Sequence, residues 1–424
     1  MYLEIDDRIR FNEELTMFKN EVHRFAKEVV RPAAWALDKM DPKEAAAKDS
    51  PYFDVMRKMK KNGYHRLFIT EENGGDGAGA DEFNILFEEL GWGSVGFATA
   101  IGVDMLAPLV MDLIGAPEIQ EEVLRPWMED EGDKYHGCWA VMDPDRGSDY
   151  IIGMTHPHPE EFGIQGFCRA DRDGDDWVLN GSKSYWTSSA PVSTWVLTHP
   201  VIPPHEKFTD IGAAVLPLDA PGVTVMPPID KLGTRDDPQG QITFDNVKIP
   251  NHYMVAQMPA LALPLMKMII SCTSCGMASF YTGLARAAFE ESLKYCYERV
   301  QGNKRLVEHQ LTQYRLYKMF EKIETSRAYV RSVLRHVWRE VVETREFAQS
   351  TSHALVAQAY CKDMAFEVAH EAVQLHGGMG ITKDMLVEKL FRDARCGLIE
   401  DGVSEMLGLE AIADILAEET YTLD

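Results

Sequence analysis

Apolar residues recur every three to four positions through most of the first 130 residues, as they do along one face of an α-helix. The first such stripe, which Pro32 is expected to end, consists of Leu15, Phe18, Val22, Phe25 and Val29. Similar stripes predict helices around residues 83–90 and 98–113. The glycine-rich segment 73–79 lacks the lysine and the spacing of a phosphate-binding loop, so we interpret it as a turn between helices.

Near Lys134 the pattern changes to short runs rich in Val, Ile, Thr and Trp, separated by Gly, Pro, Asn and Asp. Such runs are typical of β-strands joined by turns. Asn180-Gly181, which lies between two of these runs, predicts a hairpin. The helical pattern returns near Ala260 and continues to the end. The predicted domains are therefore an N-terminal helical domain (1–133), a middle β domain (134–256) and a C-terminal helical domain (257–424).

A glycine break and an acidic tip stand out in the last third of the chain. An Ala-rich helix is expected to stop at Gly377-Gly378, where positive φ leaves backbone N–H groups free to face an anion. A second helix is predicted from about 385 to 395, followed by Glu400-Asp401 and Gly402. A carboxylate beside a glycine at the end of an apolar element is a candidate desolvated base. A turn with two solvated acids is the alternative.

Composition narrows the classes of function. With 424 residues, 45% of them hydrophobic, the chain can form two or three domains with substantial cores. A formal net charge of -24 disfavours nucleic acid and anionic membranes as partners, because both would repel the protein. We therefore expect a small-molecule partner.

The sequence also bears on location and metals. We expect no membrane span, and the acidic N-terminal stretch is unlike a signal or transit peptide, so the prediction is a cytoplasmic protein. Seven scattered cysteines are typical of reduced thiols, and Cys272 and Cys275 form a single CxxC without a second pair. Two histidines and two glutamates among prolines in 155–161 are interpreted as a surface insertion rather than a metal site. No metal is predicted.

Several motifs occur in an order that resembles the acyl-CoA dehydrogenase family, and the resemblance covers nearly the whole chain. Two of the family's patterns are the Q-x-x-G-G-x-G turn and the V-E-K-L-x-R-D-A helix. Others are T-E-P-x-A-G-S-D, N-G-x-K-x-W-I-T-N, K-M-G-x-R, an E-R-x-x-F-G pattern that ends in Gln, and an E-G-T-x-E tip. The matching segments are residues 141–149, 180–188, 231–235, 298–310, 374–380, 387–395 and 400–405.

This resemblance implies the acyl-CoA dehydrogenase fold, an α+β architecture with an N-terminal helical domain, a middle β-barrel-like domain and a C-terminal helical bundle. It implies a non-covalent FAD and an acyl-CoA substrate. It further implies a homotetramer, built as a dimer of dimers, and electron transfer to a soluble carrier such as an electron-transfer flavoprotein. The expected reaction is α,β-dehydrogenation of the acyl-CoA thioester.

The resemblance also assigns the residues that would bind FAD. Main-chain groups of Val141 and Met142 and the Thr187 hydroxyl would bond the flavin ring, and Ser148 would reach the pyrophosphate. Other candidates for cofactor binding are Gly147, Tyr185, Trp186, Arg299, Gln310, Gln374, Gly377 and Gly378. Of these, the glycine pair and Gln374 are expected to serve the cofactor of a neighbouring subunit.

Three positions depart from the family pattern. Met142 stands where a hydroxyl residue commonly donates to the flavin, and Tyr185 where a Trp usually shields it. Gly302-Asn303 replaces an aromatic-Gly pair near the adenine end. None of these changes removes a backbone contact, so FAD is still expected, while the flavin potential and the electron acceptor stay open.

The Glu of the family's E-G-T tip is the catalytic base, and Asp401 occupies that position here. Removing a weakly acidic α-proton needs a desolvated carboxylate of raised pKa and hydrogen bonds to the thioester oxygen. Asp401 is therefore the candidate base and oxyanion donor, with Glu400 as the alternative if the register differs by one. Ser148, Asp401 and Gly402 are the expected substrate contacts. Residues 272–274, where a minority of the family places its base, contain no carboxylate.

An alicyclic acyl group, of the cyclohexane- or cyclohexene-carbonyl type, is the expected substrate. A base one methylene shorter than Glu leaves room for a ring, and the family includes alicyclic acyl-CoA dehydrogenases that use Asp. Asp104 is a second candidate acid at the acyl pocket, with a helix cap or backbone partner as its alternative role. The competing functions are a flavin oxidase or lyase of the same fold, resembling nitroalkane oxidase or acyl-CoA oxidase, and a non-catalytic flavin-binding paralogue.

Overall fold

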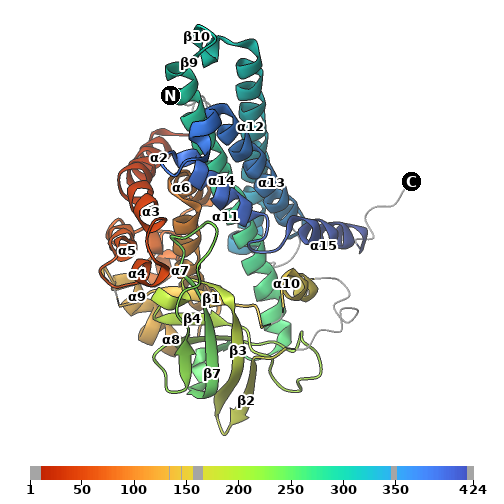
Figure 1. Cartoon of the computed structure of the whole chain (residues 1–424). Helices are drawn as coiled ribbons and strands as arrows, with labels where there is room; N and C mark the ends of the chain where they lie inside the picture. The colour runs from red at the N-terminus through yellow and green to blue at the C-terminus, as the bar shows by residue number, and fades with distance from the viewer. Residues whose placement is uncertain (1–10, 133, 145, 156–165, 345–350, 418–424) are drawn as a thin grey trace, which may run out of the picture.

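The structure is a computed structural model of the whole chain, and it describes all residues except 1–10, 133, 145, 156–165, 345–350 and 418–424. Figure 1 shows helices on one side, two β-sheets at the bottom and a long helical bundle that rises above them. The predicted α+β fold class, with helical domains around a β domain, is confirmed.

The N-terminal part is helical, as the apolar stripes predict. Its first helix does not stop at Pro32, because a π-helical turn (Ala26–Val30) joins α2 to α3 and the Arg31 N–H donates to the Ala26 carbonyl. Proline is accommodated near the start of α3, where its missing N–H costs least. The helices are α2 (Glu13–Phe25), α3 (Arg31–Leu37), α4 (Pro42–Ala45), α5 (Pro51–Lys61), α6 (Ala80–Gly93), α7 (Val95–Ile114), α8 (Pro117–Ile119) and α9 (Arg125–Glu129).

The β region contains two four-stranded sheets with the orders β1-β4-β5-β8 and β2-β3-β7-β6. Only the β1–β4 pairing within them is parallel among the described strands. The strands are β1 (Gly137–Ala140), β2 (Arg169–Asp173), β3 (Asp176–Ser188), β4 (Trp195–Thr198), β5 (Ala213–Pro217), β6 (Val223–Val225), β7 (Gln239–Ile249) and β8 (Met254–Ala256).

The predicted hairpin at Asn180-Gly181 is wrong. β3 runs straight through this dipeptide and pairs with β7 on both sides of it, with a register irregularity at that point. Gly181 takes φ of 120° to form the irregularity, and a side chain there would collide with the Phe167 carbonyl. The chain reverses instead at Gly174-Asp175, between the paired residues Asp173 and Asp176.

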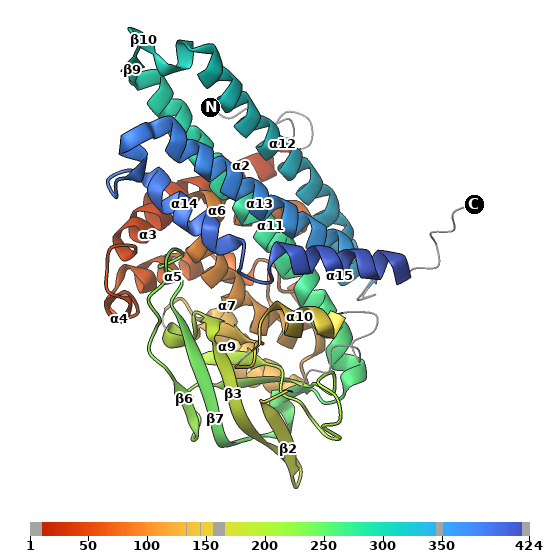
Figure 2. The same ribbon diagram turned by 45° about the vertical axis from the view of Figure 1, so that its right-hand side comes forward.

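The C-terminal helices pack around α11 (Pro259–Glu298), which runs through the whole bundle (Figures 1 and 2). A buried ion cluster joins three helices: the Arg286 guanidinium of α11 donates to Glu88 and Glu89 of α6, and Arg327 of α12 donates to Glu88. The remaining elements are α10 (Ser148–Thr155), β9 (Val300–Gln301), β10 (Lys304–Arg305), α12 (Gln310–Trp338), α13 (Thr351–His376), α14 (Leu386–Gly397) and α15 (Ser404–Ala417).

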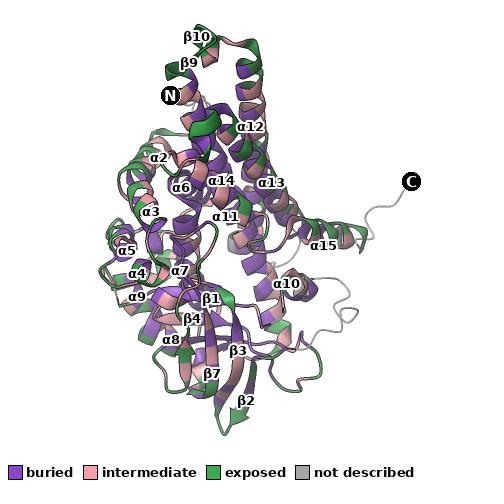
Figure 3. Ribbon diagram, viewed as in Figure 1, coloured by how far each residue is buried: buried purple, intermediate pink, exposed green. Residues whose placement is uncertain are grey.

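Two described helices, α7 and α11, are long and apolar enough to cross a membrane by length and composition alone, which the sequence analysis did not anticipate. The expectation of no membrane span stays a prediction. In each of the two helices 67% of the apolar window is buried inside the protein. A core helix meets the same criteria, and Figure 3 shows both helices largely in the colour of buried residues.

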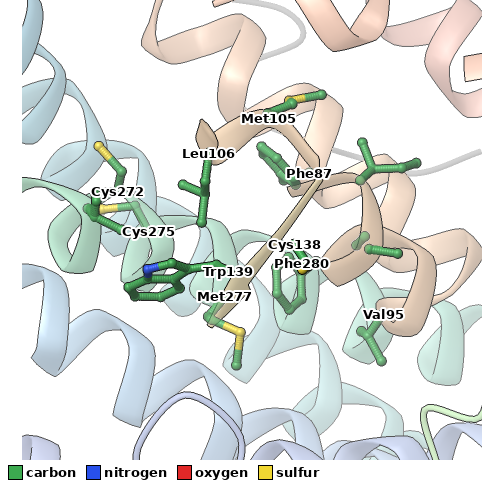
Figure 4. Close-up of a cluster of buried hydrophobic side chains, with 14 of the residues drawn as sticks. Phe87, Val95, Met105, Leu106, Cys138, Trp139, Cys272, Cys275, Met277 and Phe280 are labelled. Atoms are coloured by element: carbon green, nitrogen blue, oxygen red, sulfur yellow. The ribbon is translucent and has the colours of Figure 1, made fainter. Parts of the chain in front are cut away.

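The core between the domains is formed where α6, α7 and α11 meet β1. Figure 4 shows Phe87, Leu106 and Phe280 from the three helices together with Trp139 from the strand. Cys272 and Cys275 lie in the same cluster, and all seven cysteines are free thiols. This core forms one wall of the candidate site.

Candidate active site

A cavity of about 780 Å³ lies where the three regions meet. Its lining comes from the end of β1, the start of α10, β3, the loop before β7, helices α6, α7 and α11, and the segment after α14. Among the predicted site residues, the lining includes Val141, Met142, Gly147, Ser148, Trp186, Glu400, Asp401 and Gly402. Residues distant in the sequence are thus brought together here.

One wall of the cavity leaves large apolar side chains uncovered. Trp186, Leu232 and Ile399 are 62%, 60% and 59% exposed, although all three line the cavity. Exposed apolar side chains gathered around one cavity indicate a site that a ligand covers.

The other end of the cavity is aromatic. The rings of Phe68 and Phe83 lie 5.1 Å apart, Phe83 and Phe87 4.6 Å apart, and Trp338 stands 5.5 Å from Phe68 and 5.6 Å from Phe83. These four rings, together with Phe280, line what we call the aromatic lobe. Lining residues of α7 extend from 98 to 113, which corresponds to about 22 Å of helix.

A carboxylate fixes the loop at the end of the aromatic lobe. One oxygen of Asp112 accepts the Thr70 hydroxyl and the Asn73 amide, each at 2.6 Å, and the other accepts the Thr70 N–H at 3.1 Å. Both Thr70 and Asp112 line the cavity. The Asp112 side chain therefore holds the 70–73 loop against the lobe.

The candidate base lies in a tight loop after α14. Asp401 and Gly402 have φ of 51° and 96°, a conformation that only glycine adopts without cost. Helix α13 holds the loop: Gln358 donates to the Asp401 carbonyl at 2.8 Å, and Lys362 donates to the carbonyls of Glu400 and Gly402 at 3.0 and 2.5 Å. These bonds account for the strained backbone at Asp401.

The electrostatic environment of Asp401 suits a base. Burial raises the pKa of its carboxyl above the ordinary value, while Lys362 and the Thr273 hydroxyl act in the opposite direction. Ser148 at the start of α10 is tied to the same loop, because its hydroxyl oxygen accepts the Val403 N–H at 2.9 Å. The carboxylate and the predicted substrate contacts therefore share one loop.

Glu400, the alternative base, also lines the cavity, but both of its carboxylate oxygens are engaged. One accepts the Thr234 hydroxyl at 2.8 Å and the other accepts the Tyr281 hydroxyl at 2.9 Å. Such a carboxylate is a structural anchor between the loop and the protein interior. The geometry favours Asp401.

The hypothesis that Asp104 faces the acyl pocket is wrong. Its side chain is buried on the other side of α7, where one oxygen accepts the Gly137 N–H at 2.6 Å. Burial raises the pKa of Asp104 to about 6. The neighbouring residues Val103 and Met105 line the cavity and Asp104 does not. The alternative interpretation, a hydrogen bond from Asp104 to the backbone, is the one that the structure supports. The helix turns the Asp104 side chain away from the cavity.

Two predicted flavin contacts on β3 also differ from expectation. Trp186 and Ser188 line the cavity, whereas Tyr185 and Thr187 do not, and the buried Thr187 hydroxyl donates to the Ser184 carbonyl at 3.0 Å. A second irregularity in the β3–β7 pairing, between Lys183 and Thr187, changes which side chains face the cavity. The aromatic residue of β3 that lines the cavity is therefore Trp186, not Tyr185.

The remaining predicted cofactor residues lie away from the cavity of their own chain. Arg299 follows α11, about 28 Å along that helix from the cavity-lining Phe280, and Gln310 begins α12 nearby. Gln374, Gly377 and Gly378 are exposed at the other end of α14 from Asp401. Nothing lies within 4 Å of a side chain placed at either glycine, and Gly377 has φ of 59°. This open turn is free to receive a ligand group.

Sequence reasoning missed a buried ion pair that supports the β1 end of the cavity. The Lys183 ammonium donates to Asp143 at 2.7 Å, to the Val141 carbonyl at 3.0 Å and to the His199 carbonyl at 3.1 Å. The other Asp143 oxygen accepts the Phe167 N–H at 2.7 Å. The available signal was that Lys183 stands at the same alternate positions of the chain as Trp177 and Leu179.

It also missed Gln358 and Lys362, which face the base loop from an Ala-rich helix. Their i, i+4 spacing on the apolar face was the available signal. Among the described residues, no His, Cys, Asp or Glu cluster could hold a metal ion. The predicted insertion around His156 and His158 lies outside the described residues.

Fold and site together define a class of protein with a helix-β-helix order and a half-buried carboxylate, Asp401, at a cavity that the aromatic lobe also lines. Family models match along the chain, as the acyl-CoA dehydrogenase N-terminal domain at residues 12–131, the middle domain at 138–247 and the C-terminal domain at 266–416. The chain belongs to the acyl-CoA dehydrogenase family, as its motifs indicated.

Individual relatives agree over nearly full length. A probable acyl-CoA dehydrogenase, YngJ of Bacillus subtilis, is 27% identical over 95% of this chain and 98% of its own. A 3-(aryl)acrylate reductase of Clostridium sporogenes is 25% identical over 96% of this chain and 99% of its own. The solved structure of a glutaryl-CoA dehydrogenase from Mycobacterium smegmatis in complex with FADH2 has a TM-score of 0.81 and 21% identity, covering 99% of this chain and 98% of that one.

The family uses FAD, and the cavity fits it. The uncovered apolar wall of Trp186, Leu232 and Ile399 can take a flat ring, and the open glycine turn at Gly377 can take a phosphate-bearing part. The carbonyls of Val141 and Met142 are engaged by Lys183 and by the Ser184 N–H. Any hydrogen bond to the ring from these two positions would therefore come from a main-chain N–H group.

Proposed function

We propose that this acyl-CoA dehydrogenase acts on a CoA thioester whose acyl group carries a ring, of the cyclohexane- or cyclohexene-carbonyl type. The aromatic lobe is the observation that supports this substrate, because its rings form a wide apolar chamber next to Asp401. A relative named for an aryl acrylate is consistent with a ring-bearing substrate.

In the proposed reaction, Asp401 takes the proton from the α-carbon of the thioester, so a cyclohexene-carbonyl substrate must be one whose double bond leaves a hydrogen on that carbon. Burial keeps its carboxylate poorly solvated and therefore basic. Its backbone N–H serves the thioester oxygen where negative charge develops. Ser148 and Gly402 border the reacting carbons, and the apolar lining excludes water. FAD, when bound, supplies the hydride acceptor for the β-carbon.

The proposal includes two partners. Electrons leave through a soluble carrier such as an electron-transfer flavoprotein, as the family resemblance implies. The protein assembles as a homotetramer, in which Arg299, Gln310, Gln374 and the Gly377-Gly378 turn complete the FAD site of a neighbouring subunit. Supporting this assembly, these residues are exposed and lie far from the cavity of their own chain.

The test is anaerobic bleaching of the flavin by a panel of thioesters. Cyclohexane-carbonyl- and cyclohexene-carbonyl-CoA should give the highest ratio of reduction rate to half-saturating concentration, above 3-phenylpropanoyl-, octanoyl- and butyryl-CoA. Preference for butyryl- or octanoyl-CoA over every ring ester defeats the ring proposal. Preference for the phenyl ester would support a ring-bearing substrate, but the ring would be aromatic and not alicyclic.

Gly276 offers a variant that tests the lobe itself. A side-chain carbon there would lie 3.7 Å from Phe83 and 3.9 Å from Phe280, so Gly276→Ala narrows the lobe without a collision. It should lower the rate on ring esters more than on butyryl-CoA. Gly408→Ala is the matched control, since this helical glycine is exposed with nothing within 4 Å of the added carbon.

Reoxidation separates the enzyme classes. The proposed dehydrogenase keeps its flavin reduced in air for far longer than one turnover and is reoxidised by the protein carrier. Rapid reoxidation by O2 with a carbon-acid substrate would instead indicate an oxidase of the same fold. A yellow protein that no thioester bleaches would indicate a non-catalytic paralogue.

A further inference from the structure

The Lys362 side chain is fully buried in α13, and its ammonium group ends directly beneath the base loop. It is the donor that spans the loop, since it bonds the carbonyls on both sides of Asp401. A lysine in a buried, Ala-rich helix face has a large desolvation cost, which structural packing alone does not explain.

We propose that Lys362 is a positioning residue for the base: its two hydrogen bonds fix the loop of Asp401, and its charge sets the proton affinity of that carboxylate. The proposal rests on Asp401 being the base of the proposed function. It assigns Lys362 no contact with substrate.

Three observations carry the proposal. The first is geometric: with Gln358, Lys362 supplies three hydrogen bonds to three successive carbonyls, at Glu400, Asp401 and Gly402. The second is the left-handed backbone of Asp401, which needs such restraint. The third is electrostatic, since a cation this close to a buried carboxylate stabilises its ionised form.

The charges that face Lys362 come from three elements. Asp401 and Glu400 belong to the loop, Asp363 to its own helix α13 and Glu405 to the first turn of α15. Burial outweighs these carboxylates and lowers the pKa of Lys362 to about 8. Lys362 is therefore charged throughout the acidic range.

The sign of the effect follows from this arrangement. Burial raises the pKa of Asp401, and the Lys362 charge lowers it. Without that charge the carboxylate keeps its proton to higher pH. The rate then begins to rise at a higher pH, so the rising limb of the pH profile shifts to higher pH. The Gln358 amide is neutral and bonds the Asp401 carbonyl, not its carboxylate, so its removal should leave the limb in place.

Lys362→Met is the main variant, and Gln358→Met is its matched control on the same helix face. The measurement is the anaerobic flavin-reduction rate in single turnover, from pH 5 to pH 9, with the best thioester of the panel. Lys362→Met should move the rising limb upward by about one pH unit or more and lower the plateau about tenfold. Gln358→Met should lower the plateau and leave the limb in place.

Lys362→Arg keeps the charge and should hold the limb at its wild-type pH. FAD content, affinity for free CoA and thermal unfolding are measured for every variant, and they should match wild type in Lys362→Gln, the milder neutral substitution. The proposal is overturned if Lys362→Met and Lys362→Gln are folded and the rising limb of their pH profiles stays at its wild-type pH. It is also overturned if Gln358→Met shifts the limb as much as Lys362→Met does. If Asp401→Asn reduces its flavin at the wild-type rate, the proposed function itself has failed.

Discussion

Asp401 and Glu400 are neighbours in the sequence, but their side chains have different surroundings in the structure. Both Glu400 oxygens accept hydrogen bonds, from Thr234 and Tyr281, whereas Asp401 is half-buried and lines the cavity, and burial raises the pKa of its carboxyl. Sequence reasoning could identify the pair from the family motif. It could not choose between them, because the choice depends on hydroxyl groups 119 to 166 residues away.

The first prediction concerns this pair. Asp401→Asn should keep FAD and thioester binding and lower the reduction rate by about 10³-fold or more, because the base is lost while the shape is retained. Stopped-flow flavin bleaching measures the rate, and a binding titration with the same thioester is the control. Glu400→Gln should cost much less. The opposite ranking would make Glu400 the base.

Asp104 shows why a correct helix can still give a wrong site residue. The apolar run predicts α7 well, and its neighbours Val103 and Met105 do line the cavity. Nearly every position of α7 is apolar, so the pattern has no polar face from which the orientation of Asp104 could be inferred. Its partner, the Gly137 N–H, belongs to the first strand of another domain.

At the scale of elements, helices were predictable and strand details were not. The stripes predict α6, α7, α13 and α14, since one helix shows its own periodicity. The register of β3 depends on β7, more than fifty residues away, so neither of its irregularities could be read from the local sequence. That is why Trp186, and not Tyr185, lines the cavity.

The second prediction concerns the ion pair that joins β3 to the β1 end of the cavity. Lys183 and Asp143 are both fully buried. Lys183→Met leaves the Asp143 charge without its cation and should destabilise the protein by about 3–5 kcal/mol. Urea unfolding followed by circular dichroism measures this loss.

The exposed pair between Lys248 and Asp173 provides the control for that experiment. Lys248→Met should leave the free energy of unfolding almost unchanged, because water screens an exposed pair. Equal losses in the two variants would mean that the buried pair has no special role.

The change of folding stability in acid is a property of the whole molecule, because titratable groups on several elements contribute to it. Burial lowers the pKa of His65 to about 4 and that of His136 and His199 to about 3, against 6.5 in an unfolded chain. Unfolding between these values takes up protons, so these groups make stability fall as pH drops below about 6.5. Asp104 and Asp237, whose pKa is raised to about 6, act in the opposite direction between pH 4 and 6.

The third prediction isolates one histidine. Neither ring nitrogen of His136 has a hydrogen-bond partner, and its ring packs edge-on against Phe53. His136→Phe should reduce the loss of stability between pH 7 and pH 5 by about 2 kcal/mol, since the proton taken up on unfolding is removed. Urea titrations at both pH values test this, with the exposed His370→Phe as control. An unchanged pH dependence would contradict it.

The last prediction concerns the assembly. Exposed apolar side chains occur on α12 and on the turn after α13, in the part of the bundle remote from the β-sheets in Figure 1; they are Leu311, Tyr314 and Tyr317 on α12, and Met379 and Ile381 on the turn. Monomers rarely leave many large apolar side chains uncovered, and Met379 directly follows the open Gly377-Gly378 turn in the chain. Tyr314→Glu should therefore split the proposed homotetramer and lower FAD per chain, although Tyr314 does not line the cavity. Light scattering gives the mass and absorbance of released FAD gives the content, with Met17→Glu, an exposed apolar residue on α2, as the matched control. A dissociated protein that retains one FAD per chain would show that each subunit binds its cofactor alone.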